Sequence, residues 1–359
     1  MNTLSDHFEF LQRRLEPPAE RAAMAAEFPL RVREHLQESM EIATVEPHSR
    51  LGGSYARHTA IRDIRDVDIV LFVASDYQGT LPETVLGCLS DALRGLPEVL
   101  GDVGTVELRA QRRSVNVKLT NLNFSMDIVP AIATQGLDAP LLIPDKDWRK
   151  WIETHPLGYA AMLRDLNAVH HDKVVRLIKV IKHWRDVQVA YMKPKSYWLE
   201  CAVYRLIDSS IVQTDGISQA VLMRDMLQGM LVHLSPSLSI PGAVPEIRDP
   251  ALGNNVAAKW DRSAFESFMR TLDESAELAE CALNEGVDDV EAIKLWQRVF
   301  NADGNDWFPT RPDGRAYELR AAALAGNVFV ETGTGRVRTA RPTRPHFQVP
   351  SHRYYGKRR

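Results

Sequence analysis

A glycine-rich turn followed closely by a strand that begins with two carboxylates is the feature that most constrains this chain of 359 residues. The turn contains Gly53 and Ser54, and the strand of residues 66–73 starts Asp66-Val67-Asp68 before an apolar run. Side chains alternate between the faces of a strand, so we expect Asp66 and Asp68 on one face, about 7 Å apart. Paired carboxylates suit Mg²⁺, and glycines next to the N–H groups of a helix start suit a phosphate. The stretch therefore predicts a site for a metal ion and a triphosphate.

A third carboxylate, Asp127, strengthens this interpretation. It lies in an apolar run of residues 124–129 that reads as a strand, where Ser125 and Asp127 share one face. Three carboxylates can hold two Mg²⁺ ions, one at the triphosphate and one that lowers the pKa of an attacking hydroxyl. The alternative is that the acids are solvated at strand ends, but the adjoining Gly-Ser turn favours the metal site.

The hydrophobic pattern divides the chain into a mixed first half and a helical second half. We expect helices over 1–40, broken at Pro17-Pro18, and over 81–100, with strands over 66–73, 105–109, 114–119 and 124–129. After a loop-rich connection over 130–156, we expect one long helix over 159–189 and further helices over 196–208, 216–234, 261–284 and 288–300. The predicted parts are 1–155, 156–310 and a basic tail, 311–359.

Charge and composition narrow the class of partners. Eight Lys or Arg residues and no acid follow Glu331, so the first 331 residues carry 36 basic against 47 acidic groups. An acidic body is not the footprint of a protein that grips long nucleic acid. The tail could be a nucleic-acid arm, but we favour a segment folded back onto the body through Phe347, Tyr354 and Tyr355.

Other compositional features point to a cytoplasmic protein. No apolar run is long enough to span a membrane, and no signal-peptide pattern opens the sequence. Three cysteines without CxxC spacing fit a reducing compartment and are expected to be small core side chains. His170 and His171, expected at a helix start, and His183, expected on its exposed side, are interpreted as surface or capping residues rather than general bases.

Taken together, these motifs resemble a known signature. Residues 53–61, 66–68 and 126–130 resemble the polymerase-β-type nucleotidyltransferases and, more narrowly, the bacterial cyclic-oligonucleotide synthases called CD-NTases, relatives of animal cyclic GMP-AMP synthase. Segments 151–156, 175–184, 195–200 and 296–300 match in the same order. The resemblance covers about residues 25–310. It implies an α+β, bilobal polymerase-β-like fold, with a mixed sheet, flanking helices, a helical C-terminal lobe and a long spine helix.

The resemblance also implies a role for each matching residue. Asp66, Asp68 and Asp127 would be the catalytic metal ligands for two Mg²⁺ ions, for which Mn²⁺ can substitute. The nucleotide-binding residues would be Gly53 and Ser54 at the β- and γ-phosphates, Lys182 and Ser196 at the triphosphate, and Tyr197 stacked on the donor base. Without the resemblance, Lys179 and Lys182 read equally well as a solvated helix face. His58 stands where relatives commonly carry glycine, and no His/Cys cluster marks a zinc insertion.

The implied activity is to join NTPs, ATP among them, into a cyclic di- or trinucleotide second messenger with release of pyrophosphate. An anti-phage signalling role follows from the resemblance only, and a regulatory protein partner stays open. The alternatives are a template-independent RNA-tailing enzyme and a protein-nucleotidylating transferase. A degenerate copy used as a binding module is disfavoured, because Asp66, Asp68 and Asp127 are all present.

Overall fold

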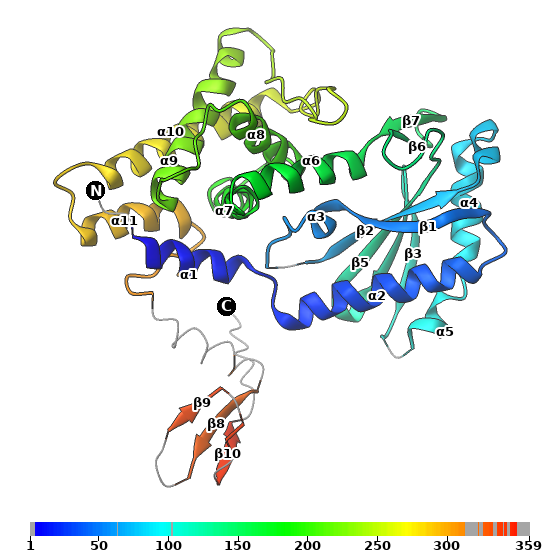
Figure 1. The fold of residues 1–359 in the computed structure, drawn as a ribbon, viewed down its shortest axis with the longest axis horizontal. Helices are drawn as coiled ribbons and strands as arrows, with labels where there is room; N and C mark the ends of the chain where they lie inside the picture. The colour runs from blue at the N-terminus through cyan, green and yellow to red at the C-terminus, as the bar shows by residue number, and fades with distance from the viewer. Residues whose placement is uncertain are drawn as a thin grey trace.

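A five-stranded mixed sheet forms the first of two lobes (Figure 1). The strand order is β1-β2-β5-β4-β3, in which β2 and β5 are parallel and the other neighbours are antiparallel. The computed structural model describes residues 4–62, 64–101, 103–312, 322, 326–332, 336–339, 341–342 and 345–349. The strands are β1 (Thr44–Gly52), β2 (Asp66–Val73), β3 (Val106–Ala110), β4 (Val115–Leu119) and β5 (Phe124–Ala131).

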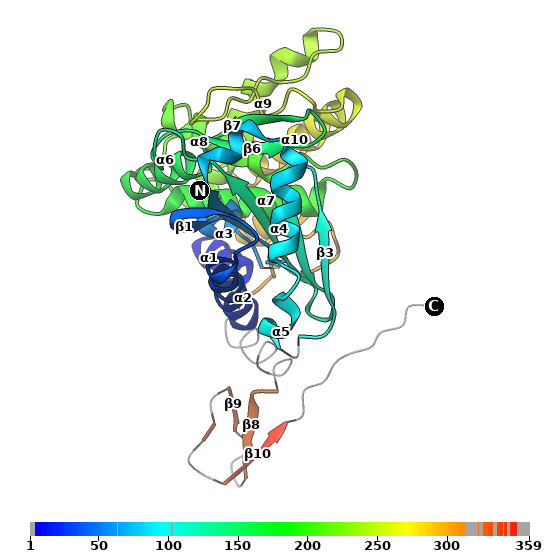
Figure 2. The same ribbon diagram turned by 90° about the vertical axis from the view of Figure 1, so that its right-hand side faces the viewer.

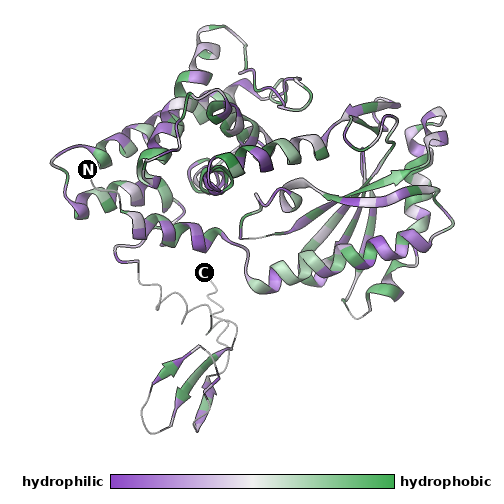
Figure 3. Ribbon diagram, in the orientation of Figure 1, coloured by the Kyte–Doolittle hydropathy of each residue, from purple (hydrophilic) through white to green (hydrophobic). Residues whose placement is uncertain are grey.

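One face of this sheet is buried under helices and the other holds the predicted carboxylates. Val67, Ile69 and Leu71 point into the covered side and are fully buried. Figures 1 and 2 show the three covering helices, and Figure 3 shows hydrophobic residues running along the strands. These helices are α2 (Ala19–Glu38), α4 (Pro82–Ala92) and α5 (Leu96–Leu100). Because alternate residues of β2 face opposite ways, its acidic residues lie on the side away from these helices.

The stretch 130–156, predicted to be loop-rich, instead contains a β-hairpin. Strands β6 (Leu141–Asp145) and β7 (Lys150–Thr154) pair with each other, and β6 residues pack against Val70 and Phe72 on the carboxylate side of the sheet. At the turn, the buried Asp145 accepts hydrogen bonds from Arg112 and Arg113 at 2.7 and 2.9 Å. These tertiary contacts stabilise a hairpin that the short apolar runs of the sequence did not predict.

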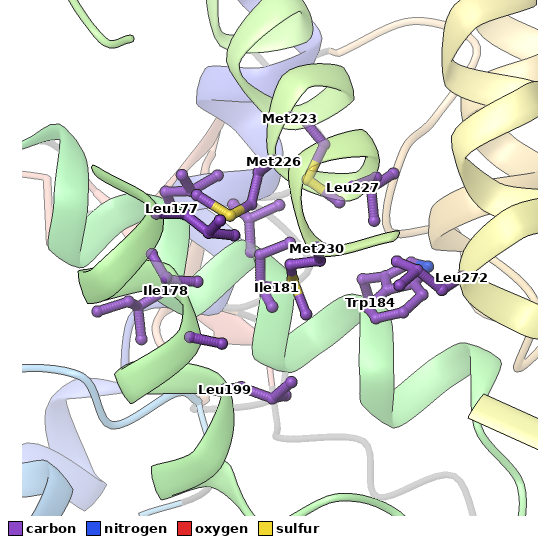
Figure 4. Packing of buried hydrophobic residues seen from close by; sticks show 14 of the residues in the cluster. Leu177, Ile178, Ile181, Trp184, Leu199, Met223, Met226, Leu227, Met230 and Leu272 are labelled. Atoms are coloured by element: carbon purple, nitrogen blue, oxygen red, sulfur yellow. The ribbon is translucent and has the colours of Figure 1, made fainter. Parts of the chain in front are cut away.

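The second lobe is a helical assembly around one apolar core. Figure 4 shows Leu177, Ile181 and Trp184 of α7 meeting Met226 and other residues of neighbouring helices. The indole of Trp184 donates to Ser275 at 2.9 Å, so its only polar atom is satisfied. The helices are α6 (Pro156–Val169), α7 (Lys173–Gln188), α8 (Ser196–Asp208), α9 (Gln219–Leu234), α10 (Arg262–Leu283) and α11 (Asp289–Phe300).

The first helix, α1 (Ser5–Leu15), belongs to this helical core although α2 covers the sheet. Phe8, Leu11 and Leu15 are buried, and the ring of Phe8 meets Trp296 edge to face at 5.0 Å. The chain therefore crosses between the lobes directly after α1. No helix in the described ranges is long and apolar enough to cross a membrane.

Several local predictions are corrected by the structure. The single helix expected over 159–189 is two helices, because His171 and Asp172 adopt positive φ values of 51° and 61° that end α6 before α7 starts. His170 and His171 lie at this break rather than at a helix start. His183, expected to be exposed, is only 3% exposed, and Cys281, expected in the core, is exposed.

Two further regions differ from expectation. β1 was not predicted as a strand, although it forms one edge of the main sheet. The tail contains a separate three-stranded sheet, drawn away from both lobes in Figures 1 and 2. Its strands are β8 (Val328–Glu331), β9 (Val337–Arg338) and β10 (His346–Val349). Phe347 is 55% exposed, so its predicted packing on the body is wrong. Tyr354 and Tyr355 lie outside the described residues.

Candidate active site

The three predicted metal ligands come from two adjacent strands of the main sheet. β2 and β5 pair in parallel register, with Asp68 opposite Asp127 and Asp66 opposite Ser125. Directly paired residues of neighbouring strands share a face, and Asp66 lies two residues before Asp68. The sheet therefore places all three carboxylates on one face, at the start of both strands.

Repulsion and burial make this group of acids costly unless a cation compensates it. Burial, together with the nearby charges of Asp66 and Asp127, raises the pKa of Asp68 to about 6. Burial also raises the pKa of Asp127, although a hydrogen bond of 2.8 Å from the Asn116 amide to Oδ1 opposes that rise. A cation bound between the carboxylates would remove the repulsion and favour their charged forms.

The donor chemistry of this group fits Mg²⁺ or Mn²⁺, since every donor is a hard carboxylate oxygen. Across the residues that the structure describes, however, no three His, Cys, Asp or Glu side chains converge closely enough to hold an ion as they stand. The assignment of Asp66, Asp68 and Asp127 as ligands therefore stays a prediction.

The glycine turn is shaped by its contact with Asp68. Gly53 has φ +63°, and a Cβ built on it would lie 1.7 Å from Asp68 Oδ2. No residue larger than glycine fits there without moving the carboxylate. Gly52 lies opposite Asp68 in the β1–β2 pairing, and a Cβ there would make only ordinary contacts of 3.4 Å and longer. The conformation of the turn and the position of the Asp68 carboxylate therefore depend on each other.

After the turn, the chain forms the short helix α3 (Gly53–Ala56), which carries Ser54. The carbonyl of Ser54 accepts hydrogen bonds from the N–H groups of Thr59 and Ala60 at 2.9 and 3.1 Å, which close the turn. A helix of four residues has only a small dipole. Any phosphate binding here would depend on the Ser54 hydroxyl and nearby backbone N–H groups.

The helical lobe contributes a buried cluster of charges to the same region. Glu200 of α8 is fully buried and accepts hydrogen bonds from Arg57 Nε at 2.8 Å and from Thr59 Oγ1 at 2.9 Å. Lys182 Nζ of α7 lies 2.7 Å from Glu200 Oε1. Lys182 and Lys179 are both buried, so the alternative of a solvated lysine face is wrong.

Burial acts on these groups in opposite directions. It lowers the pKa of Lys182 more than the single nearby carboxylate of Glu200 raises it. Burial would raise the pKa of Glu200, but Lys182 and Arg57 together outweigh it and lower that pKa to about 2. Glu200 is therefore ionised throughout the physiological range.

Ser196 and Tyr197 are held at the start of α8 by polar contacts. The Ser196 hydroxyl accepts from Arg185 Nη1 at 2.9 Å, which leaves its proton able to point at a ligand. The Tyr197 hydroxyl donates to Asp249 Oδ2 at 2.8 Å, and Arg57 lies 5.4 Å from the centre of the Tyr197 ring. Burial raises the pKa of Tyr197, so the phenol stays protonated.

A cavity of about 340 Å³ connects these groups and lies within the size range of ligand pockets. Seven of the eight predicted site residues line it: Gly53, Ser54, Asp66, Asp68, Lys182, Ser196 and Tyr197. Asp127 is not among the lining residues, but it lies beside Asp68 in the sheet. The cavity is also lined by Arg57, Thr59, Arg185 and Glu200. It therefore lies between the strand carboxylates of one lobe and the cations of the other.

Comparisons with known proteins identify the fold. The solved structure of the E. coli MS115-1 CdnC:HORMA-deltaN complex aligns with a TM-score of 0.65 at 17% identity, over 84% of this chain and 96% of that one. The Bradyrhizobium diazoefficiens CD-NTase CdnG in complex with GTP aligns with a TM-score of 0.64 at 16% identity, with the same coverage. At these identities the structures show a common fold.

The sequence relationships are closer. A family model for the Second Messenger Oligonucleotide or Dinucleotide Synthetase domain matches residues 1–167. A cyclic AMP-AMP-AMP synthase of an Acinetobacter species is 30% identical over 317 residues, which cover 84% of this chain and 86% of the relative. The chain belongs to the CD-NTase family. The predicted family and the predicted α+β nucleotidyltransferase fold are confirmed, and family membership implies an enzyme that uses a divalent metal.

Sequence reasoning about this CD-NTase missed the residues that support the predicted ones. Asn116, Arg57 and Glu200 were assigned no role, although the last two lie in the matching motifs. Glu200 follows Ser196 by four residues in an otherwise apolar stretch of α8. A carboxylate inside such a stretch is expected to be buried only if it is paired, and that signal could have identified it.

Proposed function

We propose that this CD-NTase joins NTPs, with ATP as a substrate, into a cyclic di- or trinucleotide and releases pyrophosphate. The observation that carries the proposal is the cavity, which is lined by Asp66 and Asp68 of the sheet, by Ser54 of the turn, and by Lys182 and Ser196 of the helical lobe. The name of the 30% identical relative, a cyclic AMP-AMP-AMP synthase, supports adenine as a base and a trinucleotide as a product.

In the proposed mechanism, the donor triphosphate lies along the Gly53–Ser54 turn. Ser54 and Ser196 donate hydrogen bonds to phosphate oxygens, and Lys182 and Arg185 supply positive charge. Tyr197, fixed through its hydroxyl to Asp249, stacks on the donor base. Asp66, Asp68 and Asp127 would hold two Mg²⁺ ions, which neutralise phosphate charge and lower the pKa of the acceptor hydroxyl.

Cyclisation requires the same cleft to act more than once. The 3′- or 2′-hydroxyl of the acceptor attacks the α-phosphorus, the bond to the leaving pyrophosphate breaks, and a linear oligonucleotide forms. That product re-enters with its triphosphate at the Gly53–Ser54 turn, and its terminal hydroxyl closes the ring with release of a second or third pyrophosphate. Positioning and charge stabilisation supply most of the rate in such transfers.

We also propose that the product is a second messenger in anti-phage signalling and that a protein partner regulates its synthesis. Support for the partner is the solved complex of the structurally similar CdnC with HORMA-deltaN. The acidic body and the absence of a predicted zinc insertion support a protein rather than long nucleic acid as the regulator.

The proposal is tested with the purified full chain, Mg²⁺ or Mn²⁺, and labelled NTPs, singly and mixed. We expect a phosphatase-resistant product whose mass corresponds to a cyclic oligonucleotide. The double variant Asp66→Ala/Asp68→Ala should lower the rate by at least about 10³-fold, because charge stabilisation at the α-phosphorus is lost. A double variant with unchanged product formation would contradict the assignment of the carboxylates.

A parallel assay separates the alternative activities. RNA oligonucleotides and the chain's own side chains are offered as acceptors with the same labelled NTPs. Product from NTPs alone supports cyclic-nucleotide synthesis, whereas label that appears only on RNA or protein would overturn it. Nucleotide binding without any product in either metal would support the degenerate binding module instead.

A further inference from the structure

Glu200 joins the two lobes through four hydrogen bonds or ion pairs to three residues. Its oxygens accept hydrogen bonds from Arg57 Nε at 2.8 Å, from Arg57 Nη2 at 3.3 Å and from Thr59 Oγ1 at 2.9 Å. They also form an ion pair with Lys182 Nζ at 2.7 Å. Arg57 and Thr59 follow Ser54 on the phosphate turn, while Lys182 and Glu200 belong to α7 and α8. A single carboxylate of the helical lobe therefore fixes the turn of the sheet lobe.

The contacts of Lys182 show what this carboxylate does. Its ammonium lies 2.8 Å from the Thr59 carbonyl and 3.1 Å from Thr59 Oγ1, besides its pair with Glu200. An ammonium has three N–H donors, so these partners use all of them. In this arrangement Lys182 holds the turn and places a positive charge beside it.

The charge of this arrangement is balanced only while Glu200 is present. Arg57 and Lys182 are buried side chains, and a buried cation without a partner is strongly unfavourable. The groups that face Lys182 are Glu200 from α8, Arg57 from the turn and Arg185 from α7 itself. Without Glu200, Lys182 would face two cations and no carboxylate in this group.

We propose that Glu200 is a positioning residue for the triphosphate: it pairs with Lys182 and Arg57 and holds both cations fixed behind the turn that carries Ser54. This inference rests on the proposed function, because it assigns the turn to a triphosphate. Glu200 does not touch the reacting atoms in this role. It acts through Lys182, whose positive charge would attract the phosphates, and through Thr59, whose N–H group donates to the Ser54 carbonyl and closes the turn.

The test compares Glu200→Gln, Glu200→Asp and Asp145→Asn in the full chain. Asp145 is a matched control, because it is also a fully buried carboxylate that accepts hydrogen bonds from two arginines, yet it does not line the nucleotide cavity. Thermal unfolding reports stability. KM and kcat for ATP, and the Kd of a non-hydrolysable ATP analogue with Mg²⁺, report positioning.

We expect Glu200→Gln to raise KM and Kd at least tenfold at pH 7 relative to wild type. The Glu200 carboxylate raises the pKa of Lys182, so its loss lets Lys182 give up its proton at a lower pH. The ratio of variant to wild-type Kd should therefore grow between pH 7 and pH 9. Glu200→Asp should recover part of the affinity. Asp145→Asn should lower the unfolding temperature but leave KM and Kd near wild type.

The inference is overturned if Glu200→Gln binds the analogue as wild type does at both pH values, or if Asp145→Asn weakens binding equally. Should Glu200→Gln fail to fold, Thr59→Val removes only the shared hydroxyl and decides the matter: a several-fold rise in Kd supports the inference, and no change overturns it. Because analogue binding needs no turnover, wild type that binds but forms no product would contradict the proposed function and still test Glu200.

Discussion

Gly53 and Asp68 occupy adjoining space that one added methyl group would fill. We predict that Gly53→Ala lowers nucleotidyl transfer about 100-fold, because the new Cβ would displace a carboxylate that must be placed within a fraction of an ångström. The positive φ adds about 1–3 kcal/mol of strain for a residue with a side chain. Product formation and urea unfolding of the purified variant measure the two effects.

Gly52→Ala is the matched control for this substitution. Gly52 has an extended backbone, and its added Cβ would meet Val70 and Asp68 only at ordinary contact distances. It should keep activity within about threefold of wild type, as a substitution without a clash usually does. Equal losses in the two variants would show that the contact between Gly53 and Asp68 is not what makes the turn sensitive.

At the scale of single residues, the sequence predicts the positions that follow from a short repeating pattern. The two-residue period of a strand is enough to put Asp66 and Asp68 on one face, and the apolar flanks of Asp127 are enough to place it in a strand. The role of Glu200 depends instead on Arg57, which lies 143 positions earlier in the chain. A long-range ion pair of this kind leaves no periodic pattern, so a buried carboxylate reads as an ordinary polar residue.

Among the helices and strands, predictions succeeded where an element is long and its apolar pattern regular. The expected helix over 196–208 matches α8 residue for residue. The β6–β7 hairpin was missed because its strands are short and its stability depends on the pairing of Asp145 with Arg112 and Arg113. The break between α6 and α7 was missed because the apolar pattern continues across it, while two left-handed residues end the helix.

The buried position of His183 on α7 makes the stability of the helical lobe depend on pH. Its ring lies 4.7 Å from that of Trp307, and Nε2 lies 3.2 Å from the Phe300 carbonyl oxygen. Burial lowers the pKa of His183 from 6.5 to about 4, although Asp303 and Asp186 oppose that shift. The unfolded chain therefore takes up this proton first, and stability falls as pH drops from about 6.5 towards 4.

We predict that His183 makes the free energy of unfolding about 2 kcal/mol lower at pH 5 than at pH 8. His183→Gln should show a pH dependence that is smaller by about this amount, measured by urea unfolding at both pH values. His171→Asn, at an exposed position with positive φ that asparagine tolerates, should keep the wild-type dependence. Identical pH dependence in His183→Gln and wild type would contradict the prediction.

The arrangement of the whole molecule explains how one cleft can serve successive transfers. Sheet-lobe carboxylates and helical-lobe cations line the same cavity, and the two lobes are joined at Glu200 and by the chain segments between α1 and α2 and between β7 and α6. Neither lobe contains the full set of site residues. The position of one lobe against the other therefore fixes the site, and this relation could be inferred from the sequence only through the family resemblance.

The tail gives the last prediction. All predicted site residues lie between Gly53 and Tyr197, and β8–β10 form a sheet of their own. A chain that ends at Pro312 should therefore make product from NTPs within about twofold of the wild-type rate, because surface changes away from a site rarely cost more.

Removal of residues 1–16 is the contrasting variant. It deletes Phe8, Leu11 and Leu15 from the helical core, each worth about 2–5 kcal/mol, and should unfold that lobe. If the tail-deleted chain loses activity that added RNA stimulates in wild type, the basic tail is a nucleic-acid arm that the enzyme requires, and the prediction is wrong.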